Sequence, residues 1–312
     1  MTRRMVQRGA FLLMAAALVL GISRIPAPAP APETPAPEDV VYVYNGYAAK
    51  TDAAFDTDSL DRAAYRFRHL YDLYFTGRTI FLAVVPDKAQ FTVPPEGYTP
   101  ADAAETADYL CGALDFLTPV DIAAGLTLTD YYRTDPHCRQ EQLHPTADTL
   151  LTAMGAPVPD AQEETLCALE GAFHGSYWGK TEEPLEPDTL SYLTSPVLES
   201  CTVHYYETDT DGGVYDFSAA QDAPYDLFLS GSRSLLRIDS PQALSDRTLV
   251  VFRDSFGSSL IPLLAESYRT VYAVDIRYLS SDLLGRFVDF PADADVLLLY
   301  STTVLHNSIT LK

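Results

Sequence analysis

The chain has 312 residues, of which 47% are hydrophobic, enough for one packed domain of the α/β size class. The formal net charge is −22, and a surface this acidic repels phosphate backbones, which argues against nucleic-acid binding. The four cysteines form no C-x-x-C pair and no histidine pattern has metal-ligand spacing, so we predict neither a metal site nor a cofactor. Two disulfides in any of three pairings, or free thiols, are compatible with these cysteines.

The N-terminus predicts export. Arg3, Arg4 and Arg8 precede an uncharged apolar run over residues 9–22, which is a basic n-region followed by an h-region. The run is short for a spanning helix, which usually needs about 20 residues, and no clear cleavage site follows it. We expect residues 1–25 to be an uncleaved signal anchor that places the rest of the chain outside the cytoplasm. Cleavage, giving a secreted protein, is the alternative.

A proline-rich segment follows the apolar run. Residues 26–38 read PAPAPAPETPAPE, and alternating Pro and Ala favour extended polyproline II. We predict a semi-rigid linker that holds a globular domain, residues 39–312, away from the membrane.

The first half of this domain alternates between strand and helix patterns. Residues 40–44 predict a short strand, and the amphipathic helix that follows can be capped by Asp58 and ended by Gly77. Residues 79–85, TIFLAVV, form an unbroken apolar run typical of a strand covered on both faces. Thr99, which precedes a proline, suits the N-cap of a second helix that runs to about residue 117.

The second half begins with a β-rich stretch. Residues 200–240 are rich in turn residues and predict an insertion or an edge hairpin. Apolar runs at 249–252, 271–274 and 296–300 predict further buried strands, and residues 258–268 predict a helix. Strands that alternate with helices imply a three-layer α/β/α fold with a central, mostly parallel sheet.

Ser255 lies at the turn between a predicted strand and the next helix, in LVVFRDSFGSSLIPLLAESY, residues 249–268. Ligands of open α/β sheets bind at the carboxyl ends of the strands, where a helix N-terminus also offers free N–H groups. A serine there can attack a carbonyl while backbone N–H groups stabilise the oxyanion. Alternatively, Asp254, Ser255 and Ser258 only cap the helix.

Asp135 and His137 form a second candidate pair in YYRTDPHCRQEQL, residues 131–143. Pro136 favours extended geometry at Asp135, and in an extended segment residues i and i+2 point to the same side. The carboxylate can then orient the imidazole while His137 takes a proton from the serine. A loop with a surface histidine is the alternative interpretation.

Taken together, these segments resemble the DHHW family of Gram-positive bacteria. YYRTDPHCR resembles its TDHHW signature, and RDSFGSSLIPLL resembles its KDSYANS block. GRTIFLAVVPDKAQF, FHGSYWGKT and VDIRYL follow the family in the expected order, over most of residues 40–312. Aspartate and histidine precede serine, as in the alginate O-acetyltransferase proteins, so the arrangement resembles a permuted SGNH-hydrolase fold.

The resemblance implies a role for each site residue: Ser255 is the nucleophile, His137 the general base and Asp135 its orienter. Ser255 and Ser232, the latter at the family's Gly-Asn position, would serve the oxyanion hole. Three side chains are candidate substrate-binding residues, with a plainer alternative for each. Arg277 could hold a sugar carboxylate or an acetyl carbonyl, or could instead pair with Asp275. Lys88 could contact the substrate or be a solvated surface lysine. Trp178 could stack on a sugar ring or pack at the core or rim.

Three departures from the family pattern qualify this assignment. Pro136 and Cys138 replace the first histidine and the tryptophan of TDHHW, and Ser232 replaces the asparagine. The lost tryptophan could have packed under the histidine or against a sugar. The resemblance implies an O-acetyltransferase or acetylesterase of cell-surface polysaccharide, with a membrane-bound O-acyltransferase as partner. A non-catalytic glycan-binding or scaffolding protein is the alternative.

Overall fold

The computed structural model describes residues 39–160 and 164–312. The predicted signal anchor and linker, residues 1–25 and 26–38, lie outside these residues. Residues 39–312 pack as one compact unit. Among the described residues, no helix has the length and apolar character needed to cross a membrane. The four cysteines are free thiols.

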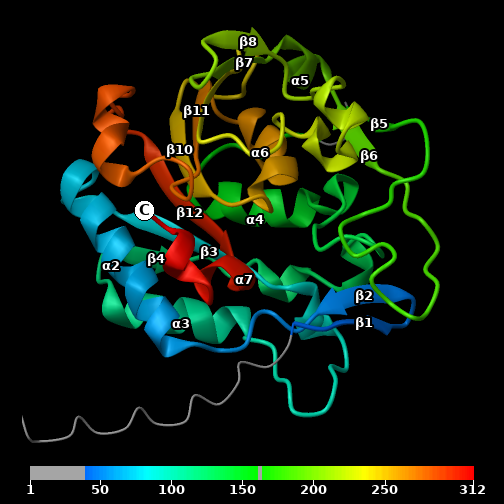
Figure 1. The fold of residues 1–312 in the computed structure, drawn as a ribbon. Coiled ribbons are helices and arrows are strands. Elements are labelled where there is room, and N and C mark those ends of the chain that lie inside the picture. Colours follow the sequence, from blue (N-terminus) through cyan, green and yellow to red (C-terminus); the bar gives the residue numbers. More distant parts are fainter. Residues whose placement is uncertain (1–38, 161–163) are drawn as a thin grey trace, which may run out of the picture. The chain divides into compact units, whose positions relative to one another are not determined.

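An eight-stranded sheet forms the centre of the molecule, in the order β4-β3-β12-β10-β11-β9-β7-β8 (Figure 1). The first five strands in this order are parallel, and the last three pair antiparallel. The predicted mostly parallel sheet is therefore confirmed, and the β-rich stretch at 200–240 supplies its antiparallel edge. The strands are β3 (Ile80–Val85), β4 (Leu117–Pro119), β7 (Thr202–Tyr205), β8 (Thr210–Gly212), β9 (Leu235–Asp239), β10 (Thr248–Arg253), β11 (Thr270–Val274) and β12 (Asp295–Ser301).

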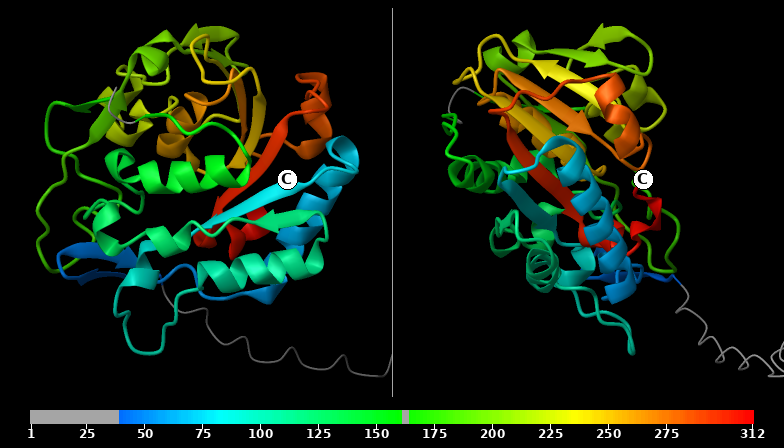
Figure 2. Two further views of the ribbon diagram at one scale, coloured as in Figure 1. Left: turned by 180° about the vertical axis from the view of Figure 1, so that it is seen from behind. Right: turned by 90° about the vertical axis from the view of Figure 1, so that its left-hand side faces the viewer.

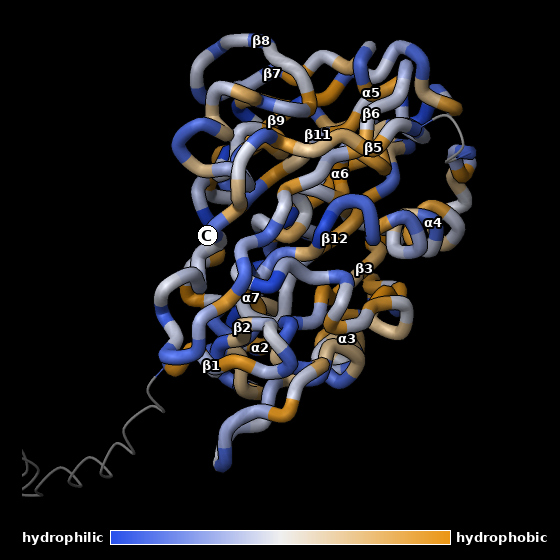
Figure 3. Tube along the Cα trace, turned by 90° about the vertical axis from the view of Figure 1, so that its right-hand side faces the viewer, coloured by the Kyte–Doolittle hydropathy of each residue, from blue (hydrophilic) through white to orange (hydrophobic). Residues whose placement is uncertain are grey.

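Helices cover both faces of this sheet, as the strand sequences require (Figures 1 and 2). Alternate residues of β10 face opposite cores: Leu249 and Val251 pack in one, Val250 and Phe252 in the other. Hydrophobic segments gather along the strands and the helices that cover them (Figure 3). The first core contains α4 (His144–Ala153) and α6 (Gly257–Ala265), and the second contains α2 (Thr57–Tyr74), α3 (Ala103–Ala113) and α7 (Thr302–Leu305).

Short elements lie around the sheet. The strand predicted at 40–44 is present as β1 (Val41–Tyr44), but it pairs with β2 (Tyr47–Lys50) in a separate hairpin. β5 (Thr165–Ala168) and β6 (Ser191–Thr194) form another two-stranded sheet, and α5 (Pro196–Ser200) follows.

Helix boundaries differ from the sequence predictions. Asp56, not Asp58, caps α2, because its extended backbone lets the carboxylate accept the Ser59 N–H at 2.9 Å. The predicted start of the next helix at Thr99 is also wrong. Pro100 forms a β-bridge with Ala54, so the chain stays extended there and Asp102 becomes the cap of α3.

Candidate active site

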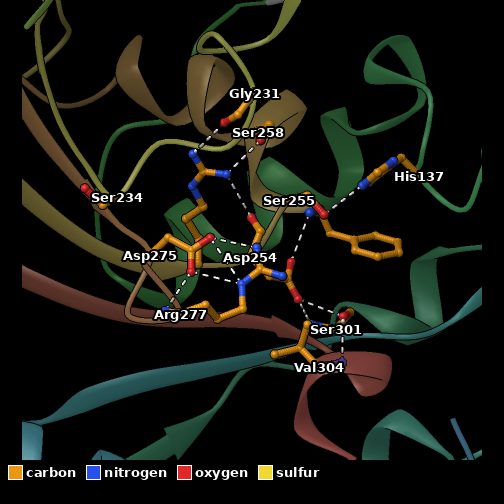
Figure 4. Close-up of polar contacts among 12 residues, drawn as sticks. His137, Gly231, Ser234, Asp254, Ser255, Ser258, Asp275, Arg277, Ser301 and Val304 are labelled. Atoms are coloured by element: carbon orange, nitrogen blue, oxygen red, sulfur yellow. Dashed lines mark hydrogen bonds and ion pairs between the residues drawn. The ribbon is translucent and has the colours of Figure 1, made fainter. Parts of the chain in front are cut away.

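Ser255, His137 and Asp135 meet at the carboxyl edge of the sheet. His137 Nε2 lies 2.9 Å from Ser255 Oγ, and His137 Nδ1 lies 2.6 Å from Asp135 Oδ1. Both distances are in the range of about 2.6–3.2 Å that a nucleophile, its base and the orienting carboxylate need. Figure 4 shows the imidazole of His137 pointing at Ser255. The structure thus brings together side chains that are 118 positions apart in sequence.

Asp135 is held as a buried carboxylate. Its Oδ2 accepts the backbone N–H of Ser176 at 2.9 Å, in addition to the Oδ1 contact with the imidazole. Burial opposes ionisation, but the charge and hydrogen bonds of His137 and the Ser176 N–H outweigh it and lower the pKa of Asp135 to about 2. Gly175 permits this approach, because a Cβ there would lie 2.3 Å from the Cβ of Asp135. An ionised Asp135 fixes the tautomer that leaves Nε2 free to accept a proton.

Lys88 supports the loop that carries Asp135. Its side chain is fully buried, and Nζ donates to the backbone oxygens of Tyr132 and Asp135, both at 2.8 Å, and of Arg133 at 3.4 Å. Burial lowers the pKa of Lys88 to about 8, against the attraction of Asp87 and Asp135. The predicted substrate-binding role of Lys88 is therefore wrong, and so is its surface alternative: the ammonium is enclosed by carbonyls.

Asp188 holds the same loop from another side. Its carboxylate accepts the N–H groups of Arg133 and Thr134, each at 2.8 Å, and the Thr134 hydroxyl at 2.6 Å. No sequence signal identifies Asp188, because nothing in its neighbourhood marks it as polar support for a loop more than 50 positions earlier.

Tyr225 and Phe256 enclose the His137 ring. The Tyr225 ring stacks on the imidazole with centroids 3.9 Å apart and 12° between the planes, and Phe256 approaches at 4.8 Å. The Tyr225 hydroxyl lies 3.1 Å from Ser259 Oγ. Cys138, at the position of the family tryptophan, is buried in the core with Tyr131 instead. The aromatic ring against the histidine thus comes from a distant segment, the turn Pro224–Leu227.

The turn at Ser255 is fixed by Asp254. One carboxylate oxygen accepts the Phe256 N–H at 2.9 Å, and the other accepts the N–H and hydroxyl of Ser301 at 2.8 and 2.7 Å (Figure 4). Residue Phe256 is at the N-cap of α6, where no side chain caps the helix. Because Ser255 Oγ contacts His137 and Ser258 Oγ contacts Arg253, the alternative that these residues only cap the helix is wrong.

Arg277 forms the ion pair that the sequence offered as its alternative. Its Nε and Nη2 contact the carboxylate of Asp275 at 2.9 and 2.7 Å, just beyond β11 (Figure 4). Burial lowers the pKa of this guanidinium, but hydrogen bonds to Asp275 more than reverse the effect and the net shift is upward. Two of its five N–H donors, on Nε and Nη2, are therefore used by Asp275.

Ser232 and Trp178 are exposed on two loops. Ser232 follows Gly231, and within the described chain neither its hydroxyl nor its N–H has a hydrogen-bond partner. Trp178 is 38% exposed and packs on His174 with centroids 4.2 Å apart, so it lies on the rim. Its turn also carries Ser176, which binds Asp135.

No protein-family model matches the sequence, and no curated protein matches it. Solved structures do match. A DHHW family protein from Eubacterium siraeum has a TM-score of 0.67 and 21% identity, over 88% of this chain and 96% of that one. Bacillus cereus PatB1 with a sulfonyl adduct has a TM-score of 0.66 and 16% identity, over 86% and 97%. The O-acetyltransferase domain of Pseudomonas putida AlgJ has a TM-score of 0.51 and 15% identity, over 86% and 92%.

At these identities the likeness concerns the fold. The sequence motifs that resemble the DHHW family lie in a chain whose architecture matches a DHHW protein, PatB1 and AlgJ. The protein therefore has the SGNH-like three-layer α/β/α fold that the sequence predicted.

Proposed function

We propose that this protein is a serine-dependent O-acetyltransferase or acetylesterase that acts on polysaccharide hydroxyls. The single observation that carries the proposal is the continuous chain of contacts Asp135–His137–Ser255, at 2.6 and 2.9 Å. The fold shared with the O-acetyltransferase domain of AlgJ supports the reaction class.

In the proposed reaction, Ser255 Oγ attacks the acetyl carbonyl of a donor ester while His137 Nε2 takes the hydroxyl proton. The tetrahedral intermediate collapses, His137 returns the proton to the departing alcohol, and the acetyl group stays on Ser255. A sugar hydroxyl or water then attacks the acetyl carbonyl and His137 takes its proton. The Ser255 ester bond breaks, and His137 returns the proton to Ser255 Oγ. A sugar acceptor gives transfer, and water gives hydrolysis.

The oxyanion would be held by the backbone N–H groups of Ser255 and Ser232. Within the described chain neither N–H has an acceptor, so both are available to an incoming oxygen. We assign sugar stacking to Trp178 with His174, and contact with a substrate carbonyl or carboxylate to Arg277 beside its ion pair. Of the substitutions that motivated the non-catalytic alternative, Cys138 is buried in the core, and Pro136 lies between two residues whose contacts support the proposal.

The polysaccharide and its location are part of the proposal. We place the domain outside the cytoplasm, tethered by residues 1–25, on the basis of the basic and apolar N-terminal sequence. A membrane-bound O-acyltransferase would then supply acetyl groups. Intact mass of the mature protein checks the tether: a chain that starts near residue 27 or later means cleavage and release.

The activity is tested with purified protein and an activated acetyl ester. We expect one acetyl group on the peptide that contains Ser255, found by mass spectrometry after a rapid quench. Added oligosaccharides distinguish the two outcomes, because acetylated sugar means transfer and acetate alone means hydrolysis. Glycan binding without ester turnover or acetylation of Ser255 would contradict the proposal and favour a non-catalytic protein.

A further inference from the structure

Arg253 is a buried cation that has no ion-pair partner in the part of the chain that the structure describes. It ends β10, and the residue is 1% exposed. No carboxylate of residues 39–160 or 164–312 lies within 4.0 Å of its guanidinium. A buried charge is costly unless it is paired or hydrogen-bonded. The neutral groups that accept hydrogen bonds from Arg253 must therefore stabilise its charge.

Those partners, Ser258, Asp254 and Gly231, lie on the same side of the sheet as Ser255 and close to it (Figure 4). Nη1 donates to Ser258 Oγ at 2.9 Å and to the backbone oxygen of Asp254 at 3.3 Å. Nη2 donates to the backbone oxygen of Gly231 at 3.3 Å. One guanidinium therefore joins the end of β10, the start of α6 and the loop before β9.

The two carbonyl groups that Arg253 contacts belong to peptide units of the candidate site. The Asp254 carbonyl belongs to the peptide unit whose N–H is that of Ser255, and the Gly231 carbonyl to the unit whose N–H is that of Ser232. A cation on a carbonyl oxygen polarises the whole peptide, which makes its N–H a stronger donor. These are the two N–H groups that the proposed function assigns to the oxyanion.

The loop at Gly231 also needs support. Leu229, Ser230 and Gly231 have φ values of 54, 57 and 70°, a left-handed run that is costly for the first two. Asp226 packs so closely that a Cβ on Gly231 would lie 2.3 Å from its carboxylate. The Nη2 contact ties the end of this strained segment to β10.

We propose that Arg253 is a positioning residue that polarises both oxyanion-hole peptides at once. This inference rests on the proposed function. Arg253 does not touch the substrate. The two Nη atoms of its planar guanidinium donate to two different carbonyls, and the single ammonium of a lysine cannot reproduce this geometry. Its charge then stabilises the tetrahedral intermediate through the peptide units of Ser255 and Ser232.

Arg253→Lys tests this, with Arg247→Lys as the matched control. Arg247 precedes the other end of β10 and also donates to two backbone oxygens, of Met154 at 2.8 Å and Gly155 at 2.5 Å. We expect Arg253→Lys to slow acetylation of Ser255 about ten-fold or more at an unchanged half-saturating ester concentration, since loss of a whole oxyanion donor costs about 10²–10³-fold. Arg247→Lys should react at the parent rate.

Amide resonances separate polarisation from a purely structural role. In Arg253→Lys the ¹⁵N resonances of Ser255 and Ser232 should both move upfield, and in Arg247→Lys neither should. A folded Arg253→Lys variant with parental acetylation and unshifted amides overturns the inference. If the parent itself is never acylated, the proposed function fails, and the amide shifts alone decide whether Arg253 polarises the peptides.

An experiment on the unsubstituted protein tests the inference even if the Arg253→Lys variant does not fold. Phenylmethanesulfonyl fluoride that modifies Ser255 would place a sulfonyl oxygen near the oxyanion position. The Arg253 Nε–H is buried and has no partner in the described chain, so its resonance reports on the guanidinium. We expect this resonance to shift on adduct formation. An adduct at Ser255 that leaves it unmoved overturns the inference.

Discussion

The imidazole of His137 and the phenol ring of Tyr225 lie face to face, 3.9 Å apart and 12° from parallel. This contact fixes the plane of the ring, while Asp135 fixes its tautomer. A stack of this kind contributes about 0.5–1.5 kcal/mol, enough to influence the rate if it is lost.

Tyr225→Leu should therefore lower kcat about 3- to 10-fold, because the imidazole gains freedom to rotate away from Ser255. Tyr225→Phe keeps the stack and loses the hydroxyl contacts with Ser259 Oγ at 3.1 Å and with the backbone oxygen of Ser255 at 3.4 Å, so it should retain most of the activity. Steady-state kinetics on both variants checks this. Equal decreases in kcat for the two variants would mean that the Tyr225 hydroxyl, and not the stacked ring, supports the activity.

Ser255→Ala should abolish ester turnover and leave the fold intact. Among the described residues the hydroxyl has one polar contact to lose, at 2.9 Å to His137, whereas removal of a nucleophile costs several orders of magnitude in rate. Ser218→Ala, on an exposed turn, is the control. Turnover by purified Ser255→Ala at the parent rate would rule out the proposed mechanism.

Lys88→Met should destabilise the protein by about 3 kcal/mol, since buried carbonyls of Tyr132 and Asp135 lose a charged donor. The loop that presents Asp135 should loosen, with a fall in kcat as well. Lys50→Met, which removes a partly exposed lysine paired with Asp39 and Asp52, should cost less than 1 kcal/mol. Urea unfolding measures both, and similar losses would show that Lys88 does not support the loop.

Titration of the Glu266 carboxyl should make the stability of the fold depend on pH, independently of Asp135, His137 and Ser255. Burial raises its pKa to about 7, an effect that the Ser195 hydrogen bond reduces and Glu164 strengthens. A carboxyl with a raised folded pKa stabilises the fold at low pH, and this contribution is lost as the pH rises through about 7. His144 also contacts Glu164, at 2.8 Å, and its pKa is raised by that hydrogen bond despite burial.

Glu266→Gln should flatten this dependence between about pH 5 and pH 8. The melting temperature of the parent should fall across that range by more than that of the variant, because Gln cannot release a proton. Glu183→Gln, on an exposed loop, controls for loss of one charge. Parallel curves for parent and Glu266→Gln would show that Glu266 does not titrate in this window.

The sequence by itself determined the buried strands, the α/β/α class and the three positions of the candidate triad. Unbroken apolar runs such as residues 79–85 are typical of strands covered on both faces, and this one is β3. The strand-to-helix turn at Ser255 and the spacing of Asp135 and His137 are local patterns, which a single segment can carry. Residues 1–38 were interpreted from sequence alone and lie outside the described structure.

Only the tertiary structure decided which side chains support the site, because those contacts join segments far apart in sequence. Lys88 looks like a surface lysine in a short motif, yet the fold buries it against three carbonyls of a loop about 45 residues away. Tyr225 and Asp188 have no sequence signal at all. Arg253 is visible as a charge at the end of an apolar strand, but its role depends on two backbone oxygens, of which Gly231 comes from another loop. Hydrophobic periodicity encodes burial locally, whereas hydrogen bonds to backbone depend on where distant segments meet.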